Sequence, residues 1–221
     1  SLPFKINHHW EPKIGIPIAR NHALRVARES GATHIIFIDD DERVAPQWLK
    51  ELWNAYLQYD ENTIIQGAVI SAFESDHNAH LQDLLQRKIR PTGDRLDTAA
   101  TNNVTICMET LSKNHLQFDA SRPLAGGTDS KLFREAHSLN IPLIFCAEAI
   151  VYEDIPKDRI NMRWISRRYF RVGLTYGEFK RQHQAGWRFP LDRAQSLLKN
   201  SFKFLLYLIA YNPKKLRIRW I

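Results

Sequence analysis

Apolar positions along the chain switch repeatedly between helical and extended spacing. Residues 18–30 place four apolar side chains at helical spacing, and Gly31 follows as a candidate helix C-cap. The next apolar run, His34–Ile38, is short and rich in isoleucine, which indicates a buried strand. Strands that alternate with helices in this way predict an α/β fold with a mostly parallel sheet flanked by helices.

The remaining elements follow from the same two spacings. We expect helices at 48–59 and 128–138, strands at 63–73, 101–109 and 141–145, and mostly helix from about Asp158 onward. Pro46 suits the start of the helix at 48–59, because proline has no backbone N–H and the N–H groups of the first helical turn have no partner within the helix. The polar stretch 75–98 predicts a helix and a mobile loop around Pro91–Gly93.

Charge divides the chain into two parts. Residues 1–154 hold 15 Lys and Arg against 21 Asp and Glu, whereas residues 155–221 hold 16 against 3. We therefore expect an α/β domain over 1–157 and a helical basic C-terminal region over 158–221. Such a basic region favours a polyanion or an anionic membrane surface as its partner. Nucleic acid is not expected, because no helix-turn-helix, zinc or RNA-binding motif accompanies the charge.

The bulk composition is that of a soluble globular protein. A content of 44% hydrophobic and 25% charged residues is ordinary, and 221 residues can bury a substantial core. The two cysteines, Cys107 and Cys146, stand at no metal-binding spacing, so we expect reduced core thiols in a cytoplasmic protein. No signal peptide is visible.

Three consecutive carboxylates, Asp39, Asp40 and Asp41, follow the predicted strand His34–Ile38, with Glu42 behind them. Adjacent like charges repel one another and lose hydration when partly buried, so a positive group must offset them. A hard divalent cation that also holds substrate phosphates would do so at the carboxyl edge of a sheet. The alternative is a solvated acidic turn near a helix N-terminus, where negative charge is favourable.

Four further segments accompany the triplet in a fixed order. They are ARNHAL before it, and GG-x-D-x-x-LF-R, EA-x-V-x-E-x-x-P-x-x-R and W-x-x-RR-x-x-R-x-G after it. Together these segments resemble the family 2 glycosyltransferases of the GT-A fold, from about Gly15 to Arg181. The resemblance implies a metal-dependent, inverting transfer of a sugar from a nucleotide-sugar, UDP- or dTDP-linked, to a polysaccharide or lipid-linked acceptor.

The resemblance also implies roles for the acidic residues. Asp39 and Asp41 match the Asp-x-Asp pair that binds Mg²⁺ or Mn²⁺, and Glu153 falls where many members carry a metal-binding histidine. Asp129 matches the catalytic base, although Thr128 stands where the family usually has glutamate. Without the resemblance, Asp129 would read as an acid in the first turn of a helix, stabilised by the helix dipole.

Two further sets complete the expected site. The residues expected to bind the donor and its diphosphate are Asp40, Arg20, Asn21, Arg163, Arg167 and Arg171; those expected to bind the acceptor are Asn103, Gly126, Gly127, Thr128 and Trp164. Arg167 and Arg171 lie one helical turn apart and form a basic stripe suited to a diphosphate, or else a solvated helix face. Trp164 is a core residue or a stacking platform for a sugar.

One departure from the family leaves an alternative open. Residues 1–14 are too short and too polar to supply the strands that hold the nucleotide base, so 1–157 is expected to be a partial GT-A catalytic domain. The alternative is a non-catalytic GT-A-like module that binds a glycan or a partner. Nucleotide-sugar binding separates the two.

The apolar stretch 197–211 is too short for a confident membrane span, which needs ~20 apolar residues. Four basic residues follow within 214–219, so we expect an interfacial helix with a basic anchor. This predicts a cytoplasmic protein bound peripherally to the inner face of the plasma membrane. The alternative is a helix that docks on the domain or packs in a homodimer.

Overall fold

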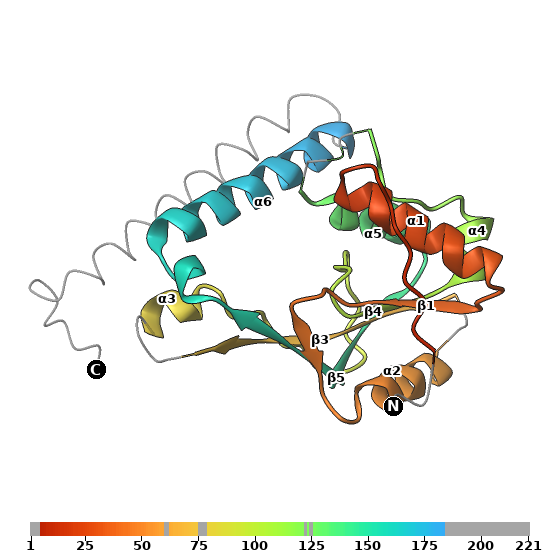
Figure 1. Ribbon diagram of the computed structural model, residues 1–221, viewed down its shortest axis with the longest axis horizontal. Coiled ribbons are helices and arrows are strands. Elements are labelled where there is room, and N and C mark those ends of the chain that lie inside the picture. The colour runs from red at the N-terminus through yellow and green to blue at the C-terminus, as the bar shows by residue number, and fades with distance from the viewer. Residues whose placement is uncertain (1–4, 60–61, 75–78, 122, 124–125, 184–221) are drawn as a thin grey trace, which may run out of the picture. The chain divides into compact units, whose positions relative to one another are not determined.

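A five-stranded mixed sheet, ordered β1-β4-β3-β5-β2, forms the centre of the protein in the computed structural model (Figure 1). The structure describes residues 5–59, 62–74, 79–121, 123 and 126–183. Its elements are α1 (Ile16–Glu29), β1 (His34–Phe37), β2 (Glu42–Val44), α2 (Trp48–Leu57), β3 (Ile64–Phe73), α3 (Ala79–Asp83), β4 (Val104–Cys107), α4 (Met108–Lys113), α5 (Thr128–Ser138), β5 (Leu143–Ile155), a 3-10 turn (Lys157–Arg159) and α6 (Met162–His183).

The strand directions place the chemistry at one edge of the sheet. β3 and β5 pair in parallel, whereas β4 is antiparallel to both β1 and β3, and β2 is antiparallel to β5. The expectation of a mostly parallel sheet is therefore wrong, because β4 inserts between two strands of like direction. β1, β3 and β5 still run the same way, so their carboxyl ends point to the same edge.

Most predicted elements are confirmed, and two strands differ. The helix predicted at 128–138 has the bounds of α5, and α1 and α2 lie where expected. β2 was not expected, because three residues after an acidic triplet are too few to show the alternation of apolar and polar side chains that is typical of a strand. β5 is long rather than short and continues to Ile155. It does so beyond an irregularity, where its register with β3 jumps from Gly67↔Cys146 to Ala68↔Ile150.

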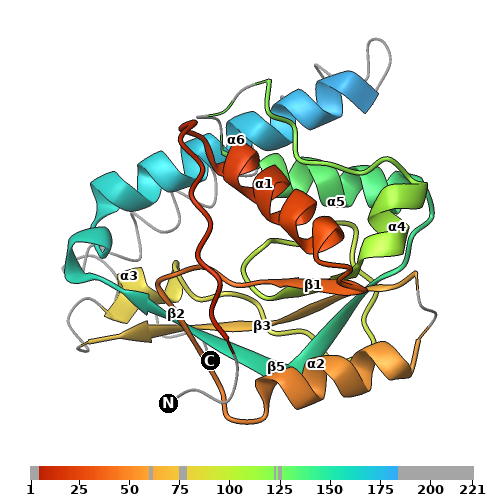
Figure 2. The same ribbon diagram turned by 45° about the vertical axis from the view of Figure 1, so that its right-hand side comes forward.

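Helices cover both faces of the sheet, and each face has its own core. α1 and α5 lie on one face and α2 on the other (Figure 2). Leu24 and Phe133 belong to the larger cluster, on the α1 and α5 side, and Leu52 and Tyr56 to the smaller one, under α2. Both cysteines are free and buried, as expected.

Asn103 joins three strands and a helix where the register of β5 breaks. Its Nδ2 donates to the Ala68 carbonyl of β3 at 2.8 Å and to the Ala149 carbonyl of β5 at 2.7 Å. Its Oδ1 accepts from Trp48 Nε1 at 2.7 Å, and its backbone N–H donates to the Phe37 carbonyl of β1. The Asn103 amide therefore supplies partners for carbonyls beside the irregular part of the ladder, which would otherwise be buried without one.

Gly67 leaves the space that the Asn103 side chain needs. A Cβ at residue 67 would lie 2.3 Å from Asn103 Nδ2 and 2.5 Å from the Ala149 carbonyl. Asn103 itself has φ of 103°, a conformation that side chains other than asparagine and glycine rarely tolerate. Both residues are therefore dictated by this junction.

The loop at Pro91–Gly93 is held in place, contrary to the expectation that it is mobile. Thr92 donates its hydroxyl to the Glu148 carboxylate and accepts from the Ala147 N–H at 2.8 Å. The Gly93 N–H donates to the Phe145 carbonyl at 2.9 Å. The loop thus binds to the irregular stretch of β5 by hydrogen bonds that no local sequence pattern announces.

The chain divides into two compact units, Ser1–Val172 and Gly173–Ile221. The first half of α6 therefore belongs to the unit that contains the sheet, beyond the boundary expected at residue 157. The predicted interfacial segment 197–211 and the basic residues of 214–219 lie outside the described residues. Within the described part, no helix is long and apolar enough to cross a membrane.

Replacing Asn103 tests this junction. Asn103→Ala leaves two buried carbonyls and the Trp48 N–H without partners, so we expect a loss of about 3 kcal/mol or more in the free energy of unfolding. Chemical denaturation monitored by circular dichroism measures it. Asn140→Ala is the control, because Asn140 also has positive φ but is exposed. Equal losses in the free energy of unfolding for the two variants would mean that the positive φ alone, and not the hydrogen bonds of Asn103, accounts for the effect.

Candidate active site

The acidic triplet forms a tight turn between β1 and β2. The Glu42 N–H donates to the Asp39 carbonyl at 3.3 Å, and the Glu42 carboxylate accepts from the Asp39 N–H at 2.8 Å. β2 then pairs with β5 so that Glu42 stands opposite Glu153. The turn therefore holds the carboxylates of Asp39 and Asp41 at the carboxyl edge of the sheet, each with its side chain 45% exposed.

Three aspartates share the electrostatic field at this edge. Burial raises the pKa of Asp39, Arg20 lowers it, and the nearby carboxylates of Asp41 and Asp129 raise it again, with a net upward shift. Arg20 pairs with Asp39 at 3.7 Å. Asp39 and Asp129 are 90 residues apart in the chain, so the fold brings the carboxylate that follows β1 and one from α5 within electrostatic reach of each other.

Asp129 sits in the first turn of α5. Gly127, with φ of 79°, precedes the helix and lets the chain enter it by a left-handed turn. The Asp129 carboxylate accepts from the Ser130 N–H at 2.7 Å and is partly exposed. Gly126 is exposed and Thr128 is buried. The hydrogen bond holds one carboxylate oxygen of Asp129 in place, and the other oxygen could accept a hydrogen bond from a substrate hydroxyl.

Arginines gather on the other side of the carboxylates. Arg87 pairs with Glu153 at 2.6 Å, and Arg159 pairs with Asp41 at 3.6 Å. Arg168 is largely desolvated: burial lowers the pKa of its guanidinium, and the charge of Arg87 lowers it further. Glu153 and Arg159 also act on Arg168 electrostatically. Three arginines thus lie close to the carboxylates of Asp41 and Glu153.

Trp164 carries two of these arginines. The guanidinium carbon of Arg159 lies 5.8 Å from the centre of the indole ring, and that of Arg168 lies 5.4 Å from it. Such cation–π contacts hold guanidinium groups in place without neutralising them. In this structure Trp164 acts as a support for arginines, and a sugar would have to share the ring with them.

The sequence matches a known family over half of its length. The model of "Glycosyl transferase family 2" matches residues 2–117. The chain belongs to this family. It is also 28% identical, over 212 residues, to the "Succinoglycan biosynthesis protein ExoM" of Rhizobium meliloti (strain 1021); the match covers 91% of this chain and 64% of that protein. The chain therefore spans less than two thirds of the length of this relative.

One of two similar solved structures shows the same fold. The crystal structure of GalNAc-T7 with UDP, GalNAc and Mn²⁺ superposes with a TM-score of 0.51 at 15% identity, over 66% of this chain and 31% of that one. The structure of S. aureus TarS 1–349 has a TM-score of 0.46 at 16% identity, over 69% and 44%. The first likeness confirms the expected GT-A architecture, and the family membership rests on the sequence.

The residues that the sequence predicts for donor and acceptor binding do not all lie at the acidic turn. Arg20 faces the acidic turn, but Asn21 is bound on both sides to the Phe118 backbone, at 2.8 and 2.9 Å. Asn103 is fully buried with its amide in use, so we remove it from the acceptor set. Arg163, Arg167 and Arg171 are exposed, whereas their neighbour Arg168 faces the carboxylates.

Sequence reasoning missed three arginines at the site. Arg159 and Arg168 stand in motifs that carry the resemblance, at the ends of E-x-x-P-x-x-R and W-x-x-RR, so a signal for them was present. Arg87 lies in the polar stretch 75–98, and only the fold places it against Glu153. Asn102 is also new: it is 4% exposed, and its side chain lowers the pKa of the Glu42 carboxyl.

The carboxylates fit a hard divalent cation held by few protein ligands. Among the described residues, no group of three or more His, Cys, Asp or Glu side chains has a metal-binding arrangement. Glu153 is 8% exposed and paired with Arg87, so it does not complete such a group. Asp39 and Asp41 repel each other and are reachable from solvent, which suits Mg²⁺ or Mn²⁺ bound by one or two carboxylates together with substrate phosphates.

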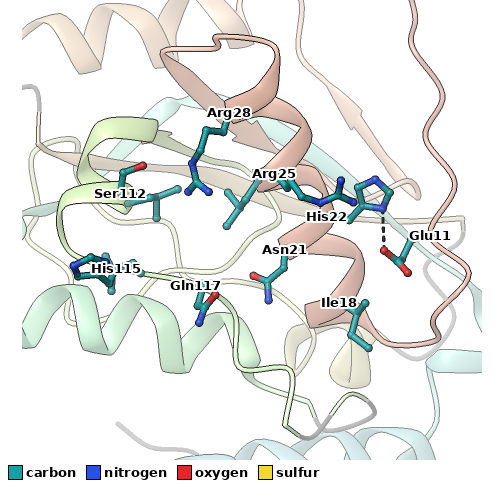
Figure 3. A pocket seen from close by; sticks show the side chains of 12 residues that line it. Glu11, Ile18, Asn21, His22, Arg25, Arg28, Ser112, His115 and Gln117 are labelled. Carbon is teal, nitrogen blue, oxygen red and sulfur yellow. Dashed lines mark ion pairs between the residues drawn. The ribbon is translucent and has the colours of Figure 1, made fainter.

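A cavity of about 750 Å³ lies elsewhere. It runs between α1 and the segment 111–117, and Figure 3 shows Arg25, Arg28 and His115 around it and the His22–Glu11 ion pair at its end. None of the carboxylates of the acidic turn lines it. The cavity is therefore separate from the cluster of charges at the acidic turn.

Glu42 gives the metal-free protein a testable pH dependence. Burial raises its pKa to about 7 from 4.5 in the unfolded chain, so its contribution to stability is present below pH 4.5 and is lost as the pH rises through 7. Glu42→Gln keeps an acceptor for the Asp39 N–H and removes the titration. We expect the variant to be roughly 1 kcal/mol more stable than the native protein at pH 8, after solvent screening, and equally stable at pH 4.

Denaturant titrations at the two pH values, in buffer with a metal chelator, measure this difference. Glu109→Gln serves as the control, because Glu109 is exposed and pairs only with Lys113 on its own helix. A constant gap between the Glu42 variant and the native protein across the pH range would contradict a raised pKa at Glu42.

Proposed function

We propose that this chain contains the donor and base sites of a glycosyltransferase that moves a sugar from a nucleoside diphosphate sugar to a glycan acceptor. The observation that carries the proposal is the meeting of Asp39, Asp41 and Asp129 with the three arginines at the carboxyl edge of the sheet. Opposite charges that meet within one site fit a donor with an anionic leaving group and an acceptor that must lose a proton.

The arginines are suited to the diphosphate of the donor. Arg159 and Arg168 rest on Trp164, and Arg87 is held by Glu153, so their positions are fixed before any ligand arrives. Arg168 has lost much of its hydration, and an anion would restore its electrostatic balance. Guanidinium groups bind phosphate oxygens in pairs, which favours a diphosphate over a single carboxylate.

Asp39 and Asp41 would hold the divalent metal. A bound Mg²⁺ or Mn²⁺ would act as a Lewis acid that neutralises the charge developing on the departing diphosphate. Arg20 and Arg159 pair with these two aspartates and limit their mutual repulsion. Asp40 lies between them in the same turn and completes the acidic loop. Glu42 keeps the turn in shape by accepting a hydrogen bond from the Asp39 N–H.

Asp129 would take the proton from the acceptor hydroxyl. The freed oxygen attacks the anomeric carbon as the bond to the diphosphate breaks, so one displacement inverts the configuration at that carbon. Gly126, which is exposed, and Gly127 and Thr128 at the start of α5 lie beside the base and would contact the acceptor. The relative named for succinoglycan biosynthesis supports a polysaccharide or its lipid-linked precursor as acceptor.

Removing the base separates chemistry from binding. Asp129→Asn keeps the shape and the bond to the Ser130 N–H, so we expect turnover to fall by roughly 10²–10⁴ with the KM for the donor unchanged. Donor hydrolysis or transfer from UDP- and dTDP-sugars measures it. Glu135→Gln, at an exposed position of the same helix, should leave turnover unchanged. A collapse of donor affinity with turnover retained would contradict the role of base.

The loss of a metal ligand can be tested by measuring Mn²⁺ affinity, without following sugar transfer. Asp41→Asn should weaken Mn²⁺ binding by roughly tenfold or more, because it deletes one of two charged oxygen ligands. Mn²⁺ titration followed by electron paramagnetic resonance gives the affinity. Asp154→Asn is the matched control. Asp154 is an exposed acid near the carboxyl end of β5, and it pairs with Arg43. Unchanged affinity for the Asp41 variant would exclude Asp41 from the metal site.

A further inference from the structure

The first half of α6 has two chemically different faces. Ile165 is buried, Arg168 is largely desolvated, and the Tyr169 hydroxyl donates to the Leu84 carbonyl at 2.8 Å. These contacts fix how the helix is turned toward the rest of its unit. Because successive residues advance by about 100°, Arg163, Arg167 and Phe170 share a face within roughly 60° of one another, nearly opposite Ile165.

We call Arg163, Arg167 and Phe170 the outer face of α6. Both arginines are exposed, and Phe170 is 68% exposed. Within the part of the chain that the structure describes, neither Arg163 nor Arg167 has an ion-pair partner. Phe170 therefore lies beside two unpaired arginines, and arginines together with an aromatic side chain are features of helices that lie on a membrane surface.

The charge of α6 narrows the choice of partner. From Asn161 to Gly177 the chain holds four arginines and no acidic residue. A second copy that packed this face against itself would oppose arginine to arginine. The chain's own segment 184–221 holds eight Lys and Arg and one acid, so its composition does not complement the charge of this face either. Charge complementarity therefore favours an extended anionic surface, and Phe170 suits the headgroup layer of a lipid bilayer.

We infer that the outer face of α6 docks on an anionic membrane. Arg163 and Arg167 contact lipid phosphates, and the Phe170 ring enters the headgroup region beside them. The inference goes beyond the proposed function and does not depend on it. It adds a consequence for the site: Arg168 and Trp164 lie on the same two turns of α6, so a docked helix holds the arginine cluster near the membrane surface.

Vesicle binding by the full chain tests the inference. Sedimentation with vesicles of phosphatidylcholine alone, or mixed with phosphatidylglycerol, gives the affinity for each surface. The native protein should bind only the anionic vesicles, and less tightly as salt is added. Each arginine contributes about fivefold, so Arg163→Gln with Arg167→Gln should weaken binding by about 25-fold. Phe170→Ser should weaken it further, with a circular dichroism spectrum like that of the native protein.

The matched control removes the same charge from another helix. Arg25 and Arg28 are exposed on α1, and Arg25→Gln with Arg28→Gln lowers the net charge equally. The inference requires that this pair bind vesicles nearly as well as the native protein. Equal losses for the two pairs would show attraction by net charge alone and overturn it. Normal vesicle binding by the variant with Arg163→Gln and Arg167→Gln would overturn it too. If sedimentation equilibrium then gave this variant a different molecular mass from the native protein, the face would be assigned to contact with a second copy.

Discussion

The architecture depends on one buried asparagine at the place where β5 departs from the register of β3. Asn103 donates to carbonyls of β3 and β5, accepts from Trp48 of α2, and binds β1 through its backbone. Without a donor at this point, β5 could not insert extra residues between its two paired halves at an acceptable cost, because the interrupted carbonyls are buried. The irregularity is thereby made stable, and β5 continues to Ile155.

The continuation of β5 is what assembles the site. It brings Glu153 opposite Glu42, and the Arg87–Glu153 pair then lies next to Arg168. The adjoining turn sets Arg159 against Asp41. Burial of charged groups and crowding of like charges are unfavourable for folding, and the raised pKa of Asp39 and the lowered pKa of Arg168 report that cost. Ligands of opposite charge recover it, which is why such a site selects a metal and a diphosphate together.

The sequence predicted the parts of this arrangement that local patterns encode. The helix at 128–138, the strand before the acidic triplet and the family motifs are properties of short segments. Asp129 could be named from its motif alone, and it does lie within electrostatic reach of Asp39. The mixed sheet, the short strand β2 and the partner of Glu153 could not be predicted in this way, since each depends on pairing between distant segments.

Asn103 and Arg168 show the same limit at single residues. Asn103 belongs to a polar doublet before an apolar strand, and a ligand-binding residue can stand in the same sequence context. Only its complete burial shows that its role is structural. Arg167 and Arg168 are neighbours of the same type, and the rotation of α6 decides which one faces the carboxylates. Local sequence fixes the side-chain chemistry, whereas tertiary contacts decide its direction.

The central claim is that the carboxylates of the acidic turn and the arginine cluster form one receptor for a metal-bound diphosphate. Calorimetric titration of UDP and of dTDP, with and without Mn²⁺, into the native protein and Arg168→Gln tests it most directly. The account predicts Mn²⁺-dependent binding of at least one of the two nucleotides, weakened at least tenfold by the substitution, with no binding of the phosphate-free nucleosides. Binding that needs neither the metal nor Arg168, or no binding at all, would contradict it.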